Sequence, residues 1–394
     1  MNNMLEEYLA ERTVRLMPPR TLVFGCGCAS QLANDIASPR FHHAMLVTAT
    51  AIQKHAASVA DELEAKGLSV LVDDSINAEP TVAMLEHVLA KARSVPIDVV
   101  VGIGGGSVLD VAKLVAALLY SEQRAADCFG IGKLAERKIY LACLPTTSGT
   151  GSEVSPNAIL LDETDELKKG VVSPYLVTDA AYIDPALTLT VPSDITAATG
   201  MDALTHCIEA YANRFAHPML DLFALKGIEL IAGSLETACE NGEDLEARSA
   251  LSLGSMYGGI CLGPVNTAGV HALAYPLGGR FHVPHGVSNA ILLPDVMEFN
   301  LSVAPERYAR IALAMDCQES ASDLVTAQRG IDRIRDMSRR CGIPTGLSDY
   351  GVSDGDIPLM AESAMKVTRL LKNNLRDITR EDAERIYRGL SRGY

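Results

Sequence analysis

Four residues in the second half of the chain have types and spacing that suit a metal site. Asp202 and His206 are spaced i, i+4 in GMDALTHCIEAY, so on a helix they share one face. His271 lies in GVHALAYPLGG, and His285 follows in FHVPHGVSNA. One carboxylate and three imidazoles can hold a borderline divalent ion such as Fe²⁺ or Zn²⁺. Such residues also form ordinary local hydrogen bonds, so their spacing alone leaves both interpretations open.

A glycine turn in the first half suits a phosphate group. It consists of Gly104, Gly105, Gly106 and Ser107, and it stands between an apolar run and a helical stretch. Glycine lets the backbone approach a pyrophosphate closely, and the start of a helix offers free N–H groups. The turn matches neither G-x-G-x-x-G nor a Walker A loop. A plain tight turn therefore remains the alternative.

A second polar loop follows the next apolar run. The segment 145–153 reads PTTSGTGSE and includes Thr146, Thr147 and Thr150. Open α/β sheets bind ligands at the carboxyl ends of their strands, where this loop is expected to lie. Hydroxyl-rich loops also form simple turns. Two such loops at successive strand ends favour nucleotide binding.

The elements that must position these residues can be read from the pattern of apolar runs. Short β-like runs occur at 21–27, 44–50, 68–74, 97–107 and 138–147. Helical stretches lie between them at about 51–66, 80–93 and 108–120. Alternation of strands and helices predicts a doubly wound parallel sheet, Rossmann-like in character.

The second half of the chain is mostly helical from about residue 192. Proline and an N-cap serine in the segment VPSD mark the change. We therefore expect a nucleotide-binding α/β domain over 1–188 and a helical metal-binding and substrate domain over 189–394. The cleft between two such domains is a natural place for chemistry.

Composition excludes several classes of partner. The net charge of −15 argues against nucleic acid and against an anionic membrane surface. No apolar run approaches the roughly 18 residues of a membrane span, and the first residues lack an apolar signal core. Nine irregularly spaced cysteines are typical of reduced thiols. We expect a cytoplasmic protein.

Four ordered motifs together resemble one family, from about residue 20 to the C-terminus. They are GGGSVLDVAK (104–113), PTTSGTGSEV (145–154), GMDALTHCIEAY (200–211) and HALAYPLGGRFHVPHGVSNAILLP (271–294). The chain resembles the iron-containing, or group III, alcohol dehydrogenases. The resemblance implies a Rossmann-like domain followed by an all-helical domain, an architecture shared with dehydroquinate synthase. It also implies NAD or NADP, one divalent metal with Fe²⁺ preferred over Zn²⁺, and a homodimer or higher homo-oligomer.

The resemblance assigns roles to individual residues. The residues that match the family's metal ligands are Asp202, His206, His271 and His285. The residues that match its cofactor loops are Gly104, Gly105, Gly106, Ser107, Thr146, Thr147 and Thr150, and a looser alignment adds Asn157 and Lys168. The implied reaction is hydride transfer between nicotinamide C4 and a metal-bound small alcohol or aldehyde.

The chain departs from the family pattern at two places. The family often has a histidine four residues after its third metal ligand, proposed to relay the alcohol proton, and here that residue is Tyr275. An unperturbed tyrosine pKa near about 10 makes a poor base at neutral pH, so the relay is assigned to Tyr275, His282 or water. Family members that prefer NAD often carry an aspartate after the second strand, whereas here Ala49 and Thr50 follow. Both NAD and NADP therefore stay open.

Two related activities remain as alternatives. Maleylacetate reductases share the run GGRFHVPH (278–285) in part, but they usually lack the full metal set. A lyase-type metalloenzyme that resembles dehydroquinate synthase would recycle its NAD within one turnover. Net accumulation of reduced nicotinamide with a simple alcohol would distinguish a dehydrogenase from this lyase.

Overall fold

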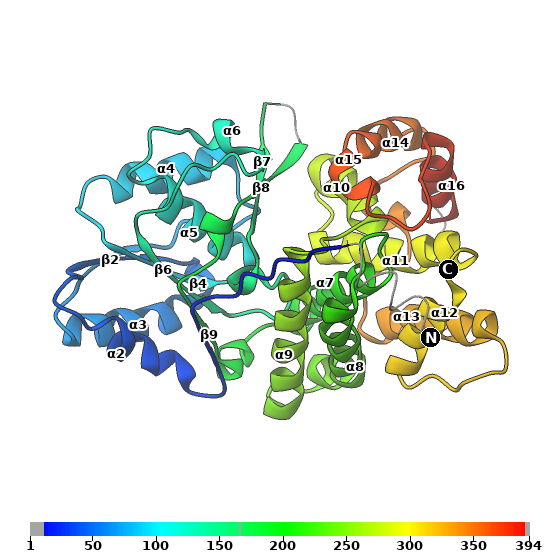
Figure 1. Cartoon of the computed structure of the whole chain (residues 1–394), viewed down its shortest axis with the longest axis horizontal. Coiled ribbons are helices and arrows are strands. Elements are labelled where there is room, and N and C mark those ends of the chain that lie inside the picture. The colour runs from blue at the N-terminus through cyan, green and yellow to red at the C-terminus, as the bar shows by residue number, and fades with distance from the viewer. Residues whose placement is uncertain (1–11, 165–166, 391–394) are drawn as a thin grey trace. The chain divides into compact units, whose positions relative to one another are not determined.

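The computed structural model describes residues 12–164 and 167–390. Contacts divide these residues into two compact units (Figure 1). The α/β unit comprises residues 17–147 and 151–191. The helical unit comprises residues 12–16, 148–150 and 192–390. The chain therefore enters the helical unit briefly within the second polar loop.

The α/β unit is built on a six-stranded parallel sheet with strand order β1-β9-β6-β4-β2-β3. Its strands are β1 (Thr21–Phe24), β2 (His43–Val47), β3 (Ser69–Asp73), β4 (Val99–Gly104), β6 (Tyr140–Pro145) and β9 (Ala180–Ile183). The central strand β4 is buried at every residue, as its sequence VVVGIG requires.

Helices cover both faces of this sheet. The principal ones are α2 (Leu32–Ile36), α3 (Gln53–Ala65), α4 (Val82–Ala92) and α5 (Gly106–Leu118), with the short α6 at Ala125–Cys128. Met45 and Val47 of β2 belong to the core shared with α4 and α5. Ala44 and Leu46 of the same strand belong to the core shared with α2 and α3. Alternate residues thus serve opposite faces, with α4 and α5 above and α2 and α3 below in Figure 1.

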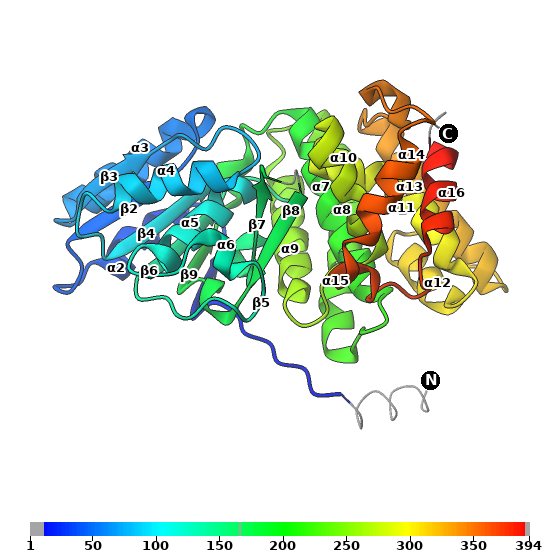
Figure 2. The ribbon, with the colours of Figure 1, turned by 90° about the horizontal axis from the view of Figure 1, so that it is seen from above.

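The predicted doubly wound sheet is confirmed, but sequence analysis missed four strands. β9 has only four residues, yet it lies between β1 and β6 in the sheet. The other three form a small separate sheet with order β5-β8-β7, visible in Figure 2. They are β5 (Gly130–Ile131), β7 (Asn157–Asp162) and β8 (Leu167–Val172). Such short or half-exposed strands carry little hydrophobic pattern of their own.

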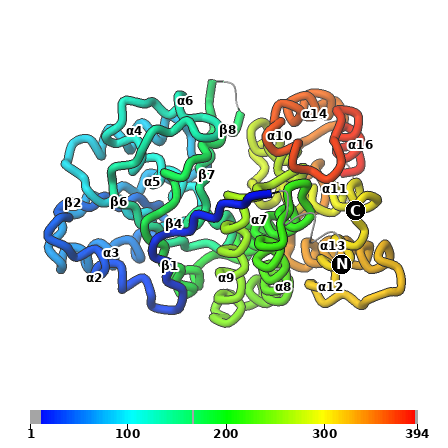
Figure 3. Tube along the Cα trace, in the orientation of Figure 1, coloured from blue at the N-terminus to red at the C-terminus, as the bar shows by residue number. Residues whose placement is uncertain are grey.

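The predicted helical half is also confirmed. Its helices are α7 (Ser193–Tyr211), α8 (Pro218–Glu240), α9 (Leu245–Leu262), α10 (Gly269–Phe281), α11 (His285–Leu301), α12 (Pro305–Ala314), α13 (Asp323–Arg340), α14 (Ile357–Met365), α15 (Thr368–Leu371) and α16 (Arg380–Leu390). Helix α7 is buried on nearly all sides and packs against α8, α9 and α11 (Figure 3). A helix in this position brings its polar residues into the interior of the unit.

Short 3-10 helices complete the described structure. They span Cys28–Gln31, Thr50–Ile52, Ser152–Val154, Pro174–Leu176, Pro185–Thr188 and Leu347–Tyr350. Among the described helices, none combines the length and the apolar character needed to cross a membrane. All nine cysteines lie within the described residues, and each is a free thiol.

Candidate active site

Three helices of the helical unit bring the four predicted metal ligands together. Asp202 and His206 project from α7, His271 from the first turn of α10, and His285 is the first residue of α11. Gly286 permits this arrangement, because a Cβ at that residue would lie 2.0 Å from the Ala198 carbonyl oxygen of α7. The start of α11 thus approaches α7 more closely than any side chain would allow.

The ligand atoms converge within a small space. Asp202 Oδ1 lies 3.5 Å from His271 Nε2, 3.6 Å from His285 Nε2 and 3.8 Å from His206 Nε2. The Nε2 atoms of His206 and His271 are 3.1 Å apart, and their rings stack with centroids 4.8 Å apart. All three imidazole Nε2 atoms are therefore within 3.8 Å of Asp202 Oδ1, and the ligand atoms of Asp202, His271 and His285 all lie within 4.8 Å of one another.

Burial differs among these residues. Asp202, His206 and His271 are almost completely buried, whereas 31% of the His285 side chain is exposed. Among the four residues, His285 is therefore the one that solvent reaches.

Electrostatics within the cluster favour a positive charge at His271, whereas burial lowers the pKa of His206. Burial alone would raise the pKa of Asp202, but the histidines around it lower that pKa strongly overall. Burial would lower the pKa of His271, yet Glu209 and Asp202 together raise it to about 9. Two buried carboxylates thus demand a cation beside them, in the form of either an imidazolium or a metal ion.

Glu209 is a site residue that sequence analysis missed. Its Oε2 lies 2.6 Å from His271 Nδ1, and its Oε1 accepts a hydrogen bond from Val270 N at 2.6 Å. A signal existed in the sequence, since Asp202, His206 and Glu209 are spaced i, i+4, i+7 and share a face of α7.

Asn289 is a second residue that sequence analysis missed. It lies one turn after His285 on α11, and its Nδ2 is 2.7 Å from Asp202 Oδ1 and 3.1 Å from His271 Nε2. Its Oδ1 is buried and has no hydrogen-bond partner among the described residues. Asn289 Nδ2 therefore lies close to Asp202 and His271, and Asn289 Oδ1 is left without a partner in the described part of the chain. Both features fit a site that accommodates a cation.

The structure places the two proton-relay candidates differently. Tyr275 lies one turn after His271 on α10, and its ring centroid is 6.4 Å from that of His285. Its ring packs in a small apolar cluster with Ala272 and Leu370. His282 is exposed and ends α10 in a left-handed conformation, with φ of 54°. Tyr275 therefore lies near His285, one of the predicted metal ligands.

The glycine turn follows the carboxyl end of β4 in the α/β unit. A Cβ at Gly104 would lie 2.6 Å from Val108, so this glycine is required for packing of α5. Gly105 is the N-cap of α5, and a Cβ there would lie 3.3 Å from Thr147 Oγ1. The two predicted cofactor loops therefore lie side by side at Gly105 and Thr147.

The remaining predicted cofactor residues follow the second loop. Thr146 and Thr147 belong to the α/β unit, and Thr150 belongs to the segment 148–150 of the helical unit. Asn157 begins β7, and its buried Oδ1 has no hydrogen-bond partner among the described residues. The Lys168 ammonium is buried and forms an ion pair with Glu79. Asn157 thus offers an unused acceptor, whereas Lys168 is already held by a carboxylate.

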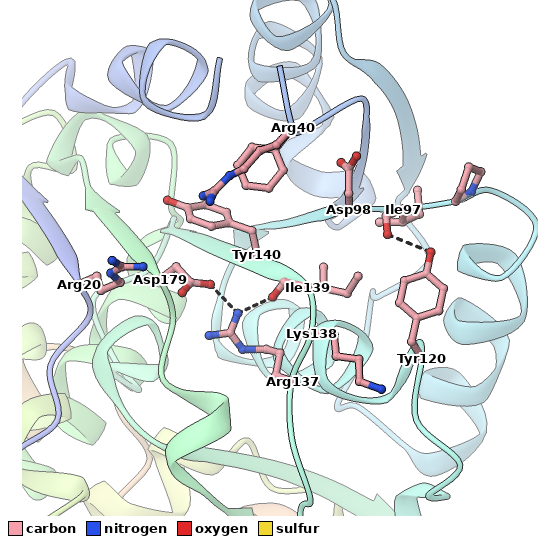
Figure 4. A pocket seen from close by; sticks show the side chains of 12 residues that line it. Arg20, Arg40, Ile97, Asp98, Tyr120, Arg137, Lys138, Ile139, Tyr140 and Asp179 are labelled. Atoms are coloured by element: carbon pink, nitrogen blue, oxygen red, sulfur yellow. Dashed lines mark hydrogen bonds and ion pairs between the residues drawn. The ribbon is translucent and has the colours of Figure 1, made fainter. Parts of the chain in front are cut away.

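A separate pocket of about 540 Å³ lies at the amino ends of the sheet strands, away from the two predicted cofactor loops at their carboxyl ends (Figure 4). It lies at the amino ends of β4 and β6, where Asp98 and Tyr140 line it. Arg137 forms an ion pair with Asp179 there at 2.5 Å. The glycine turn and the second loop follow the carboxyl ends of these strands, so this pocket contains none of the predicted site residues.

Comparison with known proteins covers nearly the whole chain. A family model described as iron-containing alcohol dehydrogenase matches residues 19–185. A second model, described as the C-terminal part of the Fe-containing alcohol dehydrogenase family, matches residues 196–390.

Individual proteins agree with these models. Long-chain-alcohol dehydrogenase 1 of Geobacillus thermodenitrificans is 37% identical over 378 residues, which cover 94% of this chain and 95% of that protein. A solved structure of 1,3-propanediol oxidoreductase superposes with a TM-score of 0.93 at 33% identity, covering 96% of this chain and all of that one. Sulfoacetaldehyde reductase from Bifidobacterium kashiwanohense, solved in complex with NAD⁺, has a TM-score of 0.87 at 27% identity, covering 96% and 99%.

Proposed function

The chain belongs to the iron-containing alcohol dehydrogenase family and is an oxidoreductase acting on CH–OH donors. We propose that it interconverts small alcohols and aldehydes and that it uses a nicotinamide cofactor and a divalent metal. The observation that carries the proposal is that three imidazole Nε2 atoms of the helical unit lie within 3.8 Å of Asp202 Oδ1.

The proposed metal ligands are Asp202, His206, His271 and His285. A set of three nitrogens and one carboxylate oxygen suits Fe²⁺ and Zn²⁺. We propose Fe²⁺ as the native ion, with Zn²⁺ as the alternative. Glu209 would hold His271 in the tautomer that presents Nε2, and Asn289 would orient Asp202.

The proposed cofactor residues are Gly104, Gly105, Gly106, Ser107, Thr146, Thr147, Thr150, Asn157 and Lys168. The start of α5 would hold the pyrophosphate with its free N–H groups. The unused buried Oδ1 of Asn157 supports a polar ligand at the start of β7. Residues 48–50, after β2, carry no carboxylate to repel a 2′-phosphate, so we propose that both NAD and NADP are accepted.

When bound, the cation would polarise the C–O bond of the substrate, and the nicotinamide would accept or return the hydride. The protein's part is to hold these groups and to exclude competing reactions. His285, the one partly exposed ligand, marks the side from which a small alcohol or aldehyde would enter. A proton must also move, and Tyr275, whose ring centroid lies 6.4 Å from that of His285, is one candidate for this step, with His282 and water as the other routes.

A substrate panel on metal-reconstituted enzyme tests this proposal. Purified protein is loaded with Fe²⁺ or Zn²⁺ and assayed with short alcohols, diols and aldehydes, using both nicotinamide cofactors in each direction. We expect metal-dependent reduction of at least one small aldehyde, with stoichiometric oxidation of the reduced cofactor. Turnover without net change in the cofactor would instead favour the lyase that resembles dehydroquinate synthase. Full activity with maleylacetate after removal of the metal would favour the reductase alternative.

A further inference from the structure

Lys113 is a fully buried lysine whose ammonium is bound by a single segment of the chain. It lies eight residues after Gly105 on α5, and its side chain has no exposed surface. The Nζ atom donates to Ser152 O at 2.9 Å, Ser152 Oγ at 3.0 Å, Ser155 O at 2.9 Å and Asn157 O. One charged side chain therefore binds three carbonyl groups of the segment that leads from the second cofactor loop into β7.

Asp110, one turn earlier on α5, binds the same part of the chain. Its Oδ1 accepts a hydrogen bond from Ser152 Oγ at 2.5 Å, and its Oδ2 accepts one from Ile159 N at 2.8 Å. Burial lowers the pKa of Lys113 and raises that of Asp110, and each charge opposes the shift of the other. Asp110 and Lys113 thus form a buried charged pair along one side of α5.

A buried pair of charges contributes little net stability, because desolvation offsets the attraction between the charges. An apolar pair would fill the same volume at least as stably, so stability gives no reason for this one. What the pair provides is geometry, since it fixes the backbone on both sides of Asn157. That side chain keeps a buried Oδ1 with no hydrogen-bond partner among the described residues.

We propose that Lys113 and Asp110 are positioning residues that hold Asn157 for the nicotinamide cofactor, an inference that rests on the proposed function. Helix α5 begins at the glycine turn, so one rigid element carries the first cofactor contact and fixes the second. Asn157 Oδ1 takes a hydrogen bond from a polar donor of the cofactor. Loss of the pair lets Asn157 move, which weakens cofactor binding without touching a cofactor contact.

The test is a double-mutant cycle on the metal-loaded protein. Lys113→Met, Asp110→Asn and the double variant remove the charges singly and together, and Asn157→Ala removes the side chain whose backbone they hold. Calorimetry gives the Kd for NADH and NADPH, and urea denaturation gives the free energy of unfolding. The double variant leaves no unpaired buried charge, so we expect it to fold while its Kd rises by about tenfold or more. Lys91→Met is the matched control, because Lys91 also binds a carbonyl group and a buried carboxylate, those of Val72 and Asp73. Its Kd should stay within about twofold of wild type.

The decisive readout is coupling, which a purely structural role would not produce. Asn157→Ala alone should raise the Kd about tenfold, and adding the double substitution to it should raise the Kd no further. Additive losses, or folded variants whose Kd stays within about twofold of wild type, would overturn the proposal. An unchanged Kd in Asn157→Ala would overturn it even if no Lys113 variant folds. If wild-type protein binds neither cofactor, the proposed function is refuted. This outcome differs from those that overturn only the role of Lys113 and Asp110, in which wild type still binds a cofactor.

Discussion

Both oxygens of Glu209 are bound by the first turn of helix α10, one by His271 Nδ1 and the other by the backbone N–H of Val270, each at 2.6 Å. Glu209 thus contacts the ring nitrogen that faces away from Asp202 and His206. If a metal ion is bound, a proton held on Nδ1 by Glu209 would leave Nε2 as the metal-binding nitrogen.

We predict that Glu209→Gln weakens metal binding while leaving the fold intact. Glutamine keeps the shape but loses the charge that supports the ring, and loss of such a partner typically costs about 10- to 100-fold in metal affinity. Competition with a chelator measures this. Glu229→Gln is the matched control, because Glu229 lies on the surface of α8 and pairs with Lys226. Equal metal affinity in both variants would remove Glu209 from the site.

Substitution of the ligands themselves should have a larger effect. We predict that His271→Ala and His285→Ala each abolish bound metal and activity together, because a four-ligand site loses affinity when one ligand is removed. Elemental analysis of each purified variant checks the metal content. His87→Ala, an exposed histidine of the α/β unit, serves as the control and should retain metal. Stoichiometric metal with normal turnover in either ligand variant would exclude that residue as a ligand.

Substitutions at the two adjacent glycines of the turn should have different effects, one on cofactor binding and one on stability. We predict that Gly105→Val weakens binding of NAD(H) and NADP(H) far more than metal binding, because its branched side chain would project toward Thr147, between the two proposed cofactor loops. Gly104→Ala should chiefly lower stability, since its Cβ would lie 2.6 Å from Val108. Calorimetric titration and urea denaturation of both variants separate the two effects. If Gly105→Val binds both cofactors as wild type does, the turn has no role in binding.

Substitution of Tyr275 tests whether its hydroxyl group supplies the proton in aldehyde reduction. Tyr275→Phe keeps the ring in its apolar cluster with Leu370 and removes only the hydroxyl group. We expect less than about tenfold loss in aldehyde reduction, because water can supply the proton to a polarised substrate. A loss of about a hundredfold, with metal content and cofactor affinity unchanged, would make Tyr275 the general acid.

Glu153 should make stability depend on pH. Burial raises the pKa of this carboxyl group from 4.5 to about 7. Between these values the folded protein keeps a proton that the unfolded chain releases, so stability falls as the pH rises through this window. The loss is on the order of 3 kcal/mol by pH 8. Glu153→Gln cannot titrate, so wild type should lose stability relative to this variant between pH 5 and pH 8. Urea denaturation at both pH values measures the difference, and a difference that does not change with pH would contradict the prediction.

Local spacing in the sequence was sufficient for much of this protein. Asp202 and His206 had to share a face of any helix that contains them, because four residues complete about one turn. The buried run of β4, followed by glycine and then a helix, similarly predicted the turn at Gly105. Alternation of such runs predicted the doubly wound sheet. Each of these inferences depends only on neighbours in the chain.

Tertiary structure alone decided which distant residues meet. His271 lies 65 residues from His206, and their Nε2 atoms come within 3.1 Å only because α10 and α11 pack against α7. The partners Glu209 and Asn289 lay inside the quoted motifs, yet their roles became visible only through contacts. Lys113 is the clearest case, because its place in the motif GGGSVLDVAK gives no indication of the groups that it binds. Only the packing of α5 beneath β7 buries its charge and turns three carbonyl groups toward it. Side-chain periodicity encodes which face of an element is buried, but the partner that this face meets depends on how whole elements pack.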